Sequence, residues 1–226
     1  EIYAYGRWLM PDSGFYTYGH DRDARNWHRQ TRVHPTMTLN GEDTAFVGRQ
    51  LAWDSTVDMD VLCVENQSYR YFIHRRTVWF ADKKSRLPFI VLLDEAIADS
   101  NGELELHFPL APGKVVVDNS NGRIMTAFDD ANLLVQVTGK KPFTFREEEG
   151  WHAWSYGSRE RRTAVSAIYK GLAPYTFVSI LVPYKGTSVP ECRLLTSPEA
   201  LIAGLDPVQL DVEVAGRKHV LTRKIG

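Results

Sequence analysis

Alternation of hydrophobic and polar residues dominates this sequence and predicts β-strands along most of its length. Runs rich in β-branched and aromatic residues alternate with a period of two, which turns one face of a strand toward a core and the other toward water. The clearest runs cover residues 69–80, 89–93, 104–108, 133–137, 163–169 and 176–182.

Turn signals separate these runs. Asn40-Gly41 and Asn121-Gly122 are typical of tight turns between antiparallel strands, because both residue types tolerate left-handed backbone conformations. Strands joined by short turns, with few helical patterns, predict an all-β fold, namely a large antiparallel β-sandwich. A closing hairpin is expected over residues 208–224.

Two segments carry helical signals. Residues 197–204 combine a serine cap, Pro198 at the first helical position and a terminal Gly204, which predicts one short C-terminal helix. A short turn of helix is also expected around residues 23–29. We interpret residues 1–186 as the main sandwich and residues 187–226 as a C-terminal extension that contains the helix and the hairpin. Because strand-like alternation begins at Glu1 without an initiator methionine, we expect the chain to be part of a longer protein.

The composition is that of an ordinary globular protein, since 43% of the 226 residues are hydrophobic and 24% are charged. A formal net charge of −1 provides no global field that would attract nucleic acid. No run of about 18 apolar residues occurs, so no membrane span is predicted. Two basic clusters, residues 22–32 and 159–162, are interpreted as solvated charged faces. Cys63 is expected to be a buried free thiol.

Functional groups concentrate in residues 11–41, which are poor in aliphatic side chains. A segment of this length without clear elements is usually functional or disordered, and its aromatic residues argue against disorder. It contains three histidines and Asp12, which are metal-binding residue types, but their spacing fits no short metal motif. The alternative is a polar crossover loop held by hydrogen bonds.

Other histidines and aromatic residues lie outside this segment. His74 and His107 are on expected strands among apolar neighbours and are predicted to be buried and hydrogen-bonded. The aromatic cluster of residues 151–157, which includes Trp154 and Tyr156, fits stacking on sugar rings and packing in the core equally well. The chain contains no glycine-rich phosphate loop and no serine- or cysteine-nucleophile motif.

Several motifs occur in an order that is specific when they are taken together. They are the run from Gly6 to Gly14, Tyr18, residues 25–41 (RNWHRQTRVHPTMTLNG), residues 76–80 with 89–94, residues 104–113 (LELHFPLAPG) and residues 155–157. This order and spacing resemble the heparinase II/III family of polysaccharide lyases over roughly residues 1–185. Pro35 stands where an asparagine is more usual in the family.

The resemblance implies a supersandwich-like C-terminal β-sandwich and an N-terminal α/α-toroid, absent from this chain, with the substrate cleft between them. It implies that the full-length protein cleaves heparan sulfate or a related uronic-acid glycosaminoglycan by β-elimination, in the periplasm of a bacterium or after secretion. The catalytic histidine is expected just upstream of Glu1. No catalytic residue is therefore assigned within the chain, and the fragment alone is expected to be inactive.

By the same resemblance, Asp12 and His34 are metal ligands, and a third ligand, a histidine, is expected upstream of the chain. Two histidines and one carboxylate suit zinc, with calcium as the alternative. The residues predicted to bind substrate are Tyr16, Tyr18, Arg25, Arg29, Arg32, Trp154 and Tyr156. Guanidinium groups bind sulfate and carboxylate bidentately. The alternative for the arginines is pairing with Asp21, Asp23 or Asp43.

Two other functions stay open on the sequence alone. One is a non-catalytic carbohydrate-binding or structural β-domain. The other is a metal enzyme of the cupin type, which requires ligands that converge inside a small barrel, and no such ligand set lies within one hairpin.

Overall fold

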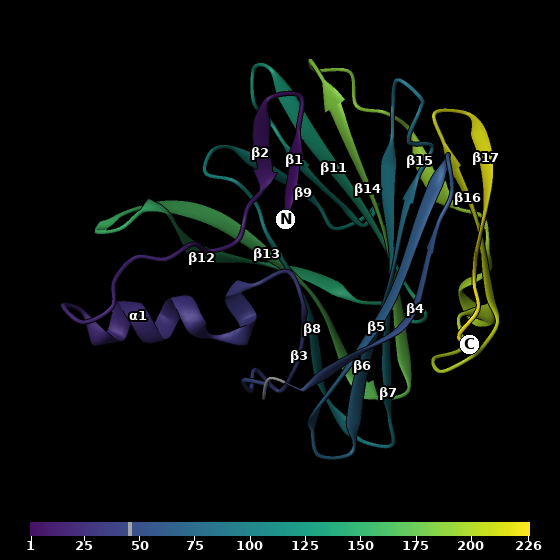
Figure 1. The fold of residues 1–226 in the computed structure, drawn as a ribbon, viewed down its shortest axis with the longest axis horizontal. Helices are drawn as coiled ribbons and strands as arrows, with labels where there is room; N and C mark the ends of the chain where they lie inside the picture. The colour runs from purple at the N-terminus through teal and green to yellow at the C-terminus, as the bar shows by residue number, and fades with distance from the viewer. Residues whose placement is uncertain (45–46) are drawn as a thin grey trace.

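The computed structural model describes residues 1–44 and 47–226, apart from the side chain of Ser68. Within these residues the strands form four sheets in which neighbouring strands are antiparallel (Figure 1). The largest has eight strands in the order β4-β5-β6-β7-β14-β11-β10-β9. Its members are β4 (Gly48–Ser55), β5 (Met59–Tyr69), β6 (Phe72–Ala81), β7 (Phe89–Ala98), β14 (Tyr175–Lys185), β11 (Ala131–Gly139), β10 (Arg123–Thr126) and β9 (Val115–Asp118).

Three smaller sheets complete the described fold. A four-stranded sheet contains, in order, β12 (Thr144–Ser155), β13 (Ser158–Leu172), β8 (Asn101–Pro109) and β3 (Met37–Leu39). A two-stranded sheet contains β1 (Ile2–Ala4) and β2 (Arg7–Met10). A three-stranded sheet contains β15 (Cys192–Leu194), β16 (Val208–Val214) and β17 (Arg217–Arg223).

The main core lies between the eight-stranded and four-stranded sheets. Leu106 and Phe108 of β8 belong to the same buried cluster as Val135 of β11 and Phe177 of β14. These side chains come from the alternating runs of the sequence, in which every second residue faces the same side. The predicted all-β sandwich is confirmed.

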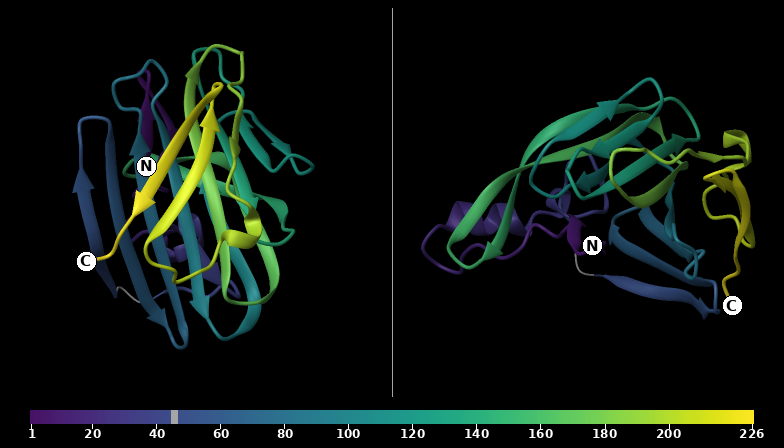
Figure 2. Two further views of the ribbon diagram at one scale, coloured as in Figure 1. Left: turned by 90° about the vertical axis from the view of Figure 1, so that its right-hand side faces the viewer. Right: turned by 90° about the horizontal axis from the view of Figure 1, so that it is seen from above.

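A second core lies on the outer face of the eight-stranded sheet, against the three-stranded sheet (Figure 2). Trp79 of β6 and Leu93 of β7 pack there with Val212 and Leu221 of the closing hairpin. The indole Nε1 of Trp79 donates a hydrogen bond to the carbonyl oxygen of Thr222 at 2.9 Å. Residues 192–223 therefore form a third layer on the sandwich.

The helical predictions had different outcomes. The helix α1 (Arg22–Arg29) forms near residues 23–29, and the Asp21 side chain accepts a hydrogen bond from Ala24 N–H at 2.9 Å as its cap. The C-terminal helix predicted over residues 197–204 is wrong in extent, because only a 3₁₀ turn, η2 (Pro198–Ala200), is present. Helix nucleation is costly in so short a segment, and burial of Leu201 in the second core ends the turn.

Several local predictions are confirmed. His74 and His107 are buried and hydrogen-bonded, and Cys63 is a buried free thiol. The closing hairpin turns at Ala215-Gly216, both with positive φ. Among the described residues, no helix has the length and apolar character needed to cross a membrane.

Candidate functional site

The chain between β2 and β3 follows the four-stranded sheet and brings α1 beside the β12–β13 hairpin, on the opposite side of the molecule from β15–β17 (Figure 1). Gly14 fixes this path. Its φ is +75°, and an added Cβ would lie only 2.1 Å from the carbonyl oxygen of Ala153. Any side chain at this position would therefore push the segment off β12. Nearby, Ala153 N–H donates to the carbonyl oxygen of Ser13 at 3.0 Å.

Asp12 and His34 meet at this site although 22 residues separate them. Oδ1 of Asp12 lies 2.5 Å from Nδ1 of His34, and each side chain is about one-third exposed, at 36% and 34%. Gly14 N–H donates to Oδ2 of Asp12 at 3.1 Å. Burial alone would raise the pKa of Asp12, but the contacts with His34 and the backbone N–H groups lower this pKa to about 2. Asp12 is therefore an anion at neutral pH.

Arg162 joins the two segments that carry this pair. Its guanidinium donates to the carbonyl oxygens of Pro11 at 2.8 Å, Asp12 at 3.2 Å and Val33 at 3.2 Å. Burial lowers the pKa of Arg162 to about 10, against the opposing effect of the Asp12 charge. The interpretation of residues 159–162 as a solvated face is wrong for Arg162, which is buried. A basic run on a strand does not show which side chain turns inward.

His152 adds a second contact to the same backbone. Its Nδ1 lies 2.7 Å from the carbonyl oxygen of Asp12, which makes Nδ1 the hydrogen-bond donor. Burial lowers the pKa of His152, which favours the neutral ring. The prediction of site residues missed His152, whose only signal was its place within the aromatic cluster.

A carboxylate oxygen and an imidazole nitrogen are ligand types that zinc prefers, so Asp12 and His34 fit the predicted metal. Among the residues that the structure describes, no third histidine, cysteine or acidic side chain joins them to form a metal-binding group. Zinc sites take three or four protein ligands. A metal site built on this pair would therefore need a ligand from outside the described residues.

The predicted substrate-binding arginines lie on and just after α1. Arg29 and Arg32 are exposed and Arg25 is half-buried. In the described part of the chain, none of the three forms an ion pair with Asp21, Asp23 or Asp43, so that alternative is wrong there. Asp21 caps α1 instead, and Asp43 accepts a hydrogen bond from Thr31 N–H. Arg29 and His34 together line a pocket with a volume of about 520 Å³.

Three of the four predicted aromatic residues, Tyr18, Trp154 and Tyr156, are exposed. The ring of Phe15, which the prediction missed, lies 4.2 Å from the ring of Tyr18 and 5.9 Å from that of Tyr156, measured between centroids. Trp154 is also exposed, and its indole N–H donates to Glu160. Trp154 and Tyr156 therefore lie outside the core. Tyr16 is half-buried, with the guanidinium of Arg159 4.7 Å above its ring.

Residues 1–195 match the family model described as heparinase II/III-like, C-terminal. A heparin-sulfate lyase of Bacteroides stercoris is 30% identical over 234 residues, covering 100% of this chain and 34% of that protein. A heparin-sulfate lyase of Pedobacter heparinus is 33% identical over 202 residues, covering 86% of this chain and 30% of that protein. The chain thus spans about a third of the length of these relatives.

The fold agrees with these similarities. The crystal structure of heparan sulfate lyase HepC from Pedobacter heparinus superposes with a TM-score of 0.85 at 30% sequence identity. The match covers 96% of this chain and 35% of that one.

Proposed function

Because the chain belongs to the heparinase II/III-like family, we propose that it forms the C-terminal β-sandwich of a polysaccharide lyase that acts on heparan sulfate or a related uronic-acid glycosaminoglycan. The observation that carries the proposal is the convergence of Asp12 and His34 beside exposed arginine and aromatic side chains. The chain accounts for about a third of the length of its relatives, and we place the catalytic groups outside this chain, with the catalytic histidine just upstream of Glu1.

The chemistry of β-elimination divides the roles between the two parts. The proton that is removed lies next to a carboxylate, so the reaction needs a group that neutralises this charge, a base for the proton and an acid for the leaving oxygen. Asp12 is unsuited to proton transfer near neutral pH, because its pKa is lowered to about 2. In the proposed enzyme this chain therefore supplies binding and positioning groups.

The exposed groups match the chemistry of an acidic polysaccharide. The exposed Arg29 and Arg32 and the half-buried Arg25 present guanidinium groups for sulfate or carboxylate. Tyr18, Tyr156 and Trp154 present aromatic faces to the C–H faces of sugar rings. Tyr16 has a lesser role, since its ring is half-buried beneath Arg159.

We also propose that Asp12 and His34 hold a divalent metal, zinc before calcium, with a histidine from outside this chain. The ion would supply positive charge that offsets Asp12 and holds together the two segments that Arg162 already joins. Metal analysis of the purified full-length protein tests this. We expect one bound ion in the wild type and loss of the ion in His34→Ala, and an equal metal content in both would contradict the assignment.

The lyase proposal predicts formation of an unsaturated product, detectable by its ultraviolet absorbance, when the full-length protein is incubated with heparan sulfate. Arg29→Ala should raise KM about tenfold with little change in kcat, since a hydrogen bond to a charged group contributes about 1.5–3 kcal/mol. The control is Arg193→Ala, which removes an exposed arginine of β15.

The outcome of this assay separates the two functions. No product from any uronate polymer would contradict the lyase. Binding of heparan sulfate without cleavage would support the carbohydrate-binding domain, which the exposed cluster of Phe15, Tyr18 and Tyr156 also favours.

For an extracellular polymer as substrate, we propose a periplasmic or secreted location. Fractionation of the producing cells tests this, and recovery of the protein only from the cytoplasm would overturn it.

A further inference from the structure

The tip of the β12–β13 hairpin carries an arginine to which the proposed function gives no role (Figure 1). The guanidinium carbon of Arg159 lies 4.6 Å from the ring centroid of Trp151 and 4.7 Å from that of Tyr16. Tyr16 is fixed beside the tip, because its carbonyl oxygen accepts a hydrogen bond from Gly157 N–H at 2.8 Å. A guanidinium is attracted to the faces of aromatic rings. Rings from two segments of the chain therefore hold Arg159 in place.

Arg159 differs from the next arginine along β13 in having no acidic partner. Arg161 also lies over Trp151, with 5.4 Å between its guanidinium carbon and the ring centroid, but its Nε pairs with Glu149 at 2.7 Å. In the part of the chain that the structure describes, Arg159 forms no ion pair and no hydrogen bond. The charge of Arg159 is therefore not compensated by a contact with an acidic side chain there.

The charge of Arg159 is also only partly accessible to water, since the residue is half-buried. An anionic acceptor would form charge-assisted hydrogen bonds with its N–H donors, and these are stronger than hydrogen bonds between neutral groups. Attraction between opposite charges is stronger in such surroundings than in bulk water. Because the two rings already restrict the side chain, binding costs less conformational entropy than it would for a freely moving arginine.

The charged groups around Arg159 favour an anion. Burial is the main cause of the lowered pKa of His28 on α1, and the charges of Arg159 and Arg162 lower this pKa further. Both guanidinium groups therefore act on the same imidazole ring. Glu160, the acidic residue next to Arg159 in the sequence, accepts a hydrogen bond from the indole N–H of Trp154.

Exposed aromatic rings lie at the same end of the hairpin. Tyr156 is 55% exposed and Phe15 is 42% exposed, and they are the sequence neighbours of Gly157 and Tyr16. Their ring centroids are 5.9 Å apart. The C–H faces of sugars pack on aromatic rings, and guanidinium groups bind carboxylate and sulfate bidentately. An acidic sugar combines both features, whereas a free inorganic anion needs the guanidinium alone.

We propose that Arg159, held by Tyr16 and Trp151, binds the carboxylate or sulfate of one sugar unit of the acidic polysaccharide. The inference rests on the proposed function and adds a subsite on β13, apart from the arginines on and just after α1. Arg159 serves the binding of substrate, so its loss should change KM and leave kcat unaltered.

The test uses Arg159→Gln in the full-length protein, because glutamine removes the charge and keeps a planar group that packs on the two rings. We expect KM for heparan sulfate to rise about tenfold, the effect of losing one charged hydrogen bond. Heparan sulfate stripped of its sulfate groups is the second substrate. An equal rise for both substrates assigns a carboxylate to Arg159, and a rise for the sulfated polymer alone assigns a sulfate. An unchanged KM for both would overturn the proposal.

Arg70→Gln is the matched control. The turn between β5 and β6 that carries Arg70 lies away from the β12–β13 hairpin (Figure 1). Arg70 is exposed, has no ion pair within the described structure, and lies over Tyr71 with 4.9 Å between its guanidinium carbon and the ring centroid. The control therefore removes the same charge and the same kind of ring contact, and KM should not change. Equal effects of the two variants, whose folding is checked by melting curves, would contradict the subsite.

A measurement on the wild type avoids substitution altogether. Phenylglyoxal modifies accessible arginines, and mass spectrometry identifies the modified residues. Saturating heparan sulfate should protect Arg159 and leave Arg70 as reactive as in the free protein. Equal protection of the two arginines, or an Arg159 that does not react in the free protein, would overturn the proposal, because the ligand must reach this guanidinium.

Calorimetry separates this inference from the proposed function. If the wild type cleaves no uronate polymer, the lyase assignment fails, and weaker binding of heparan sulfate by Arg159→Gln than by the wild type would still support the subsite. If the wild type cleaves the polymer and Arg159→Gln has the same KM, the lyase assignment stands and the subsite is wrong. Binding of inorganic sulfate that depends on Arg159, with equal binding of the polymer by both proteins, would also contradict it.

Discussion

Asp94 and Glu95 are neighbours on β7, yet they serve opposite faces of the same sheet because successive strand residues point to opposite sides. Both side chains are buried. Asp94 meets His74 at 2.6 Å and Arg76 at 2.7 Å on the face of the sheet that carries a pocket at β5 and β6. Glu95 faces Arg223 at 3.4 Å and accepts a hydrogen bond from Gly204 N–H at 2.8 Å, beneath the three-stranded sheet.

The two carboxyl groups are shifted in opposite directions. Burial would raise the pKa of Asp94, but Arg76 and His74 outweigh it and the pKa is lowered. Burial raises the pKa of Glu95, and the more distant Arg223 does not fully offset it. Two close basic partners therefore stabilise the charge of Asp94. The longer contact of Glu95 with Arg223 and its hydrogen bond from Gly204 do not outweigh burial, so the charge of Glu95 is less favourable.

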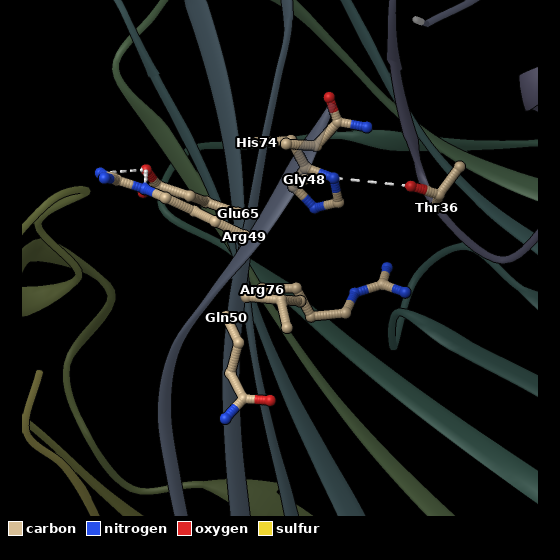
Figure 3. A pocket seen from close by; sticks show the side chains of 9 residues that line it. Thr36, Gly48, Arg49, Gln50, Glu65, His74 and Arg76 are labelled. Atoms are coloured by element: carbon tan, nitrogen blue, oxygen red, sulfur yellow. Dashed lines mark hydrogen bonds and ion pairs between the residues drawn. The ribbon is translucent and has the colours of Figure 1, made fainter. Parts of the chain in front are cut away.

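The ion pair of Glu95 with Arg223 lies inside the protein, whereas the basic partners of Asp94 reach a pocket. The Arg223 side chain is fully buried, and its remaining contacts are within the protein, to Leu205, Asp206 and Cys63. Arg76 and His74 instead line a pocket with a volume of about 410 Å³ (Figure 3). Asp94 and Glu95 are equally buried, so burial of the acidic residue does not show which ion pair adjoins a pocket. The exposure of the basic partners shows it.

The largest expected effect is on stability. Asp94→Asn removes the charge that compensates Arg76 and His74, and we expect it to lower the free energy of unfolding by about 3–5 kcal/mol. Glu95→Gln should cost only about 1–2 kcal/mol, because the amide oxygen still accepts from Gly204 N–H. Urea unfolding of both variants measures the difference. An equal or reversed order would break the distinction between the two acids.

An effect of intermediate size is expected in the pH dependence of stability. A lowered pKa in the folded state adds stability that is lost as pH falls, whereas a raised pKa makes the folded state bind protons and opposes that loss. On acidification from about pH 7 to about pH 4.5, Glu95→Gln should therefore lose more stability than the wild type, because the wild-type carboxyl binds a proton in the folded state. Below about pH 4, where the unfolded chain begins to protonate Asp94, Asp94→Asn should lose less stability than the wild type. Urea titrations across this range test the signs, and shifts in the same direction for both variants would contradict them.

The smallest effect concerns two threonines on the two sides of the sheet. Thr77 is buried on the face that the three-stranded sheet covers, which we call the sealed face. In the described structure its hydroxyl donates only a weak hydrogen bond, to Sγ of Cys63 at 3.6 Å, so Thr77→Val should be neutral or slightly stabilising. Thr36→Val removes the hydroxyl that lies 3.5 Å from Nδ1 of His74 and should cost less than about 1 kcal/mol. Thermal unfolding of the two variants makes the comparison. A larger loss for Thr77→Val would show that the sealed face depends on its polar contact.

The alternating runs were enough to predict the β-sandwich, the closing hairpin and the burial of His74 and His107, because strand periodicity is a local property of the backbone. The order of motifs was enough to predict that Asp12 and His34 belong to one site. The C-terminal helix was wrong, since burial of Leu201 against the sheet decided where that turn ends.

The partners of those residues depended on the tertiary structure. Arg162 donates to the backbone of Asp12 across 150 positions of the sequence, and Asp94 meets His74 and Arg76 only because β6 and β7 pair in one register. The sequence by itself determined which residues form strands and which segment carries functional groups. Only the folded chain decided which charged side chains turn inward and which basic groups line one pocket, because these choices depend on contacts between residues that are distant along the chain.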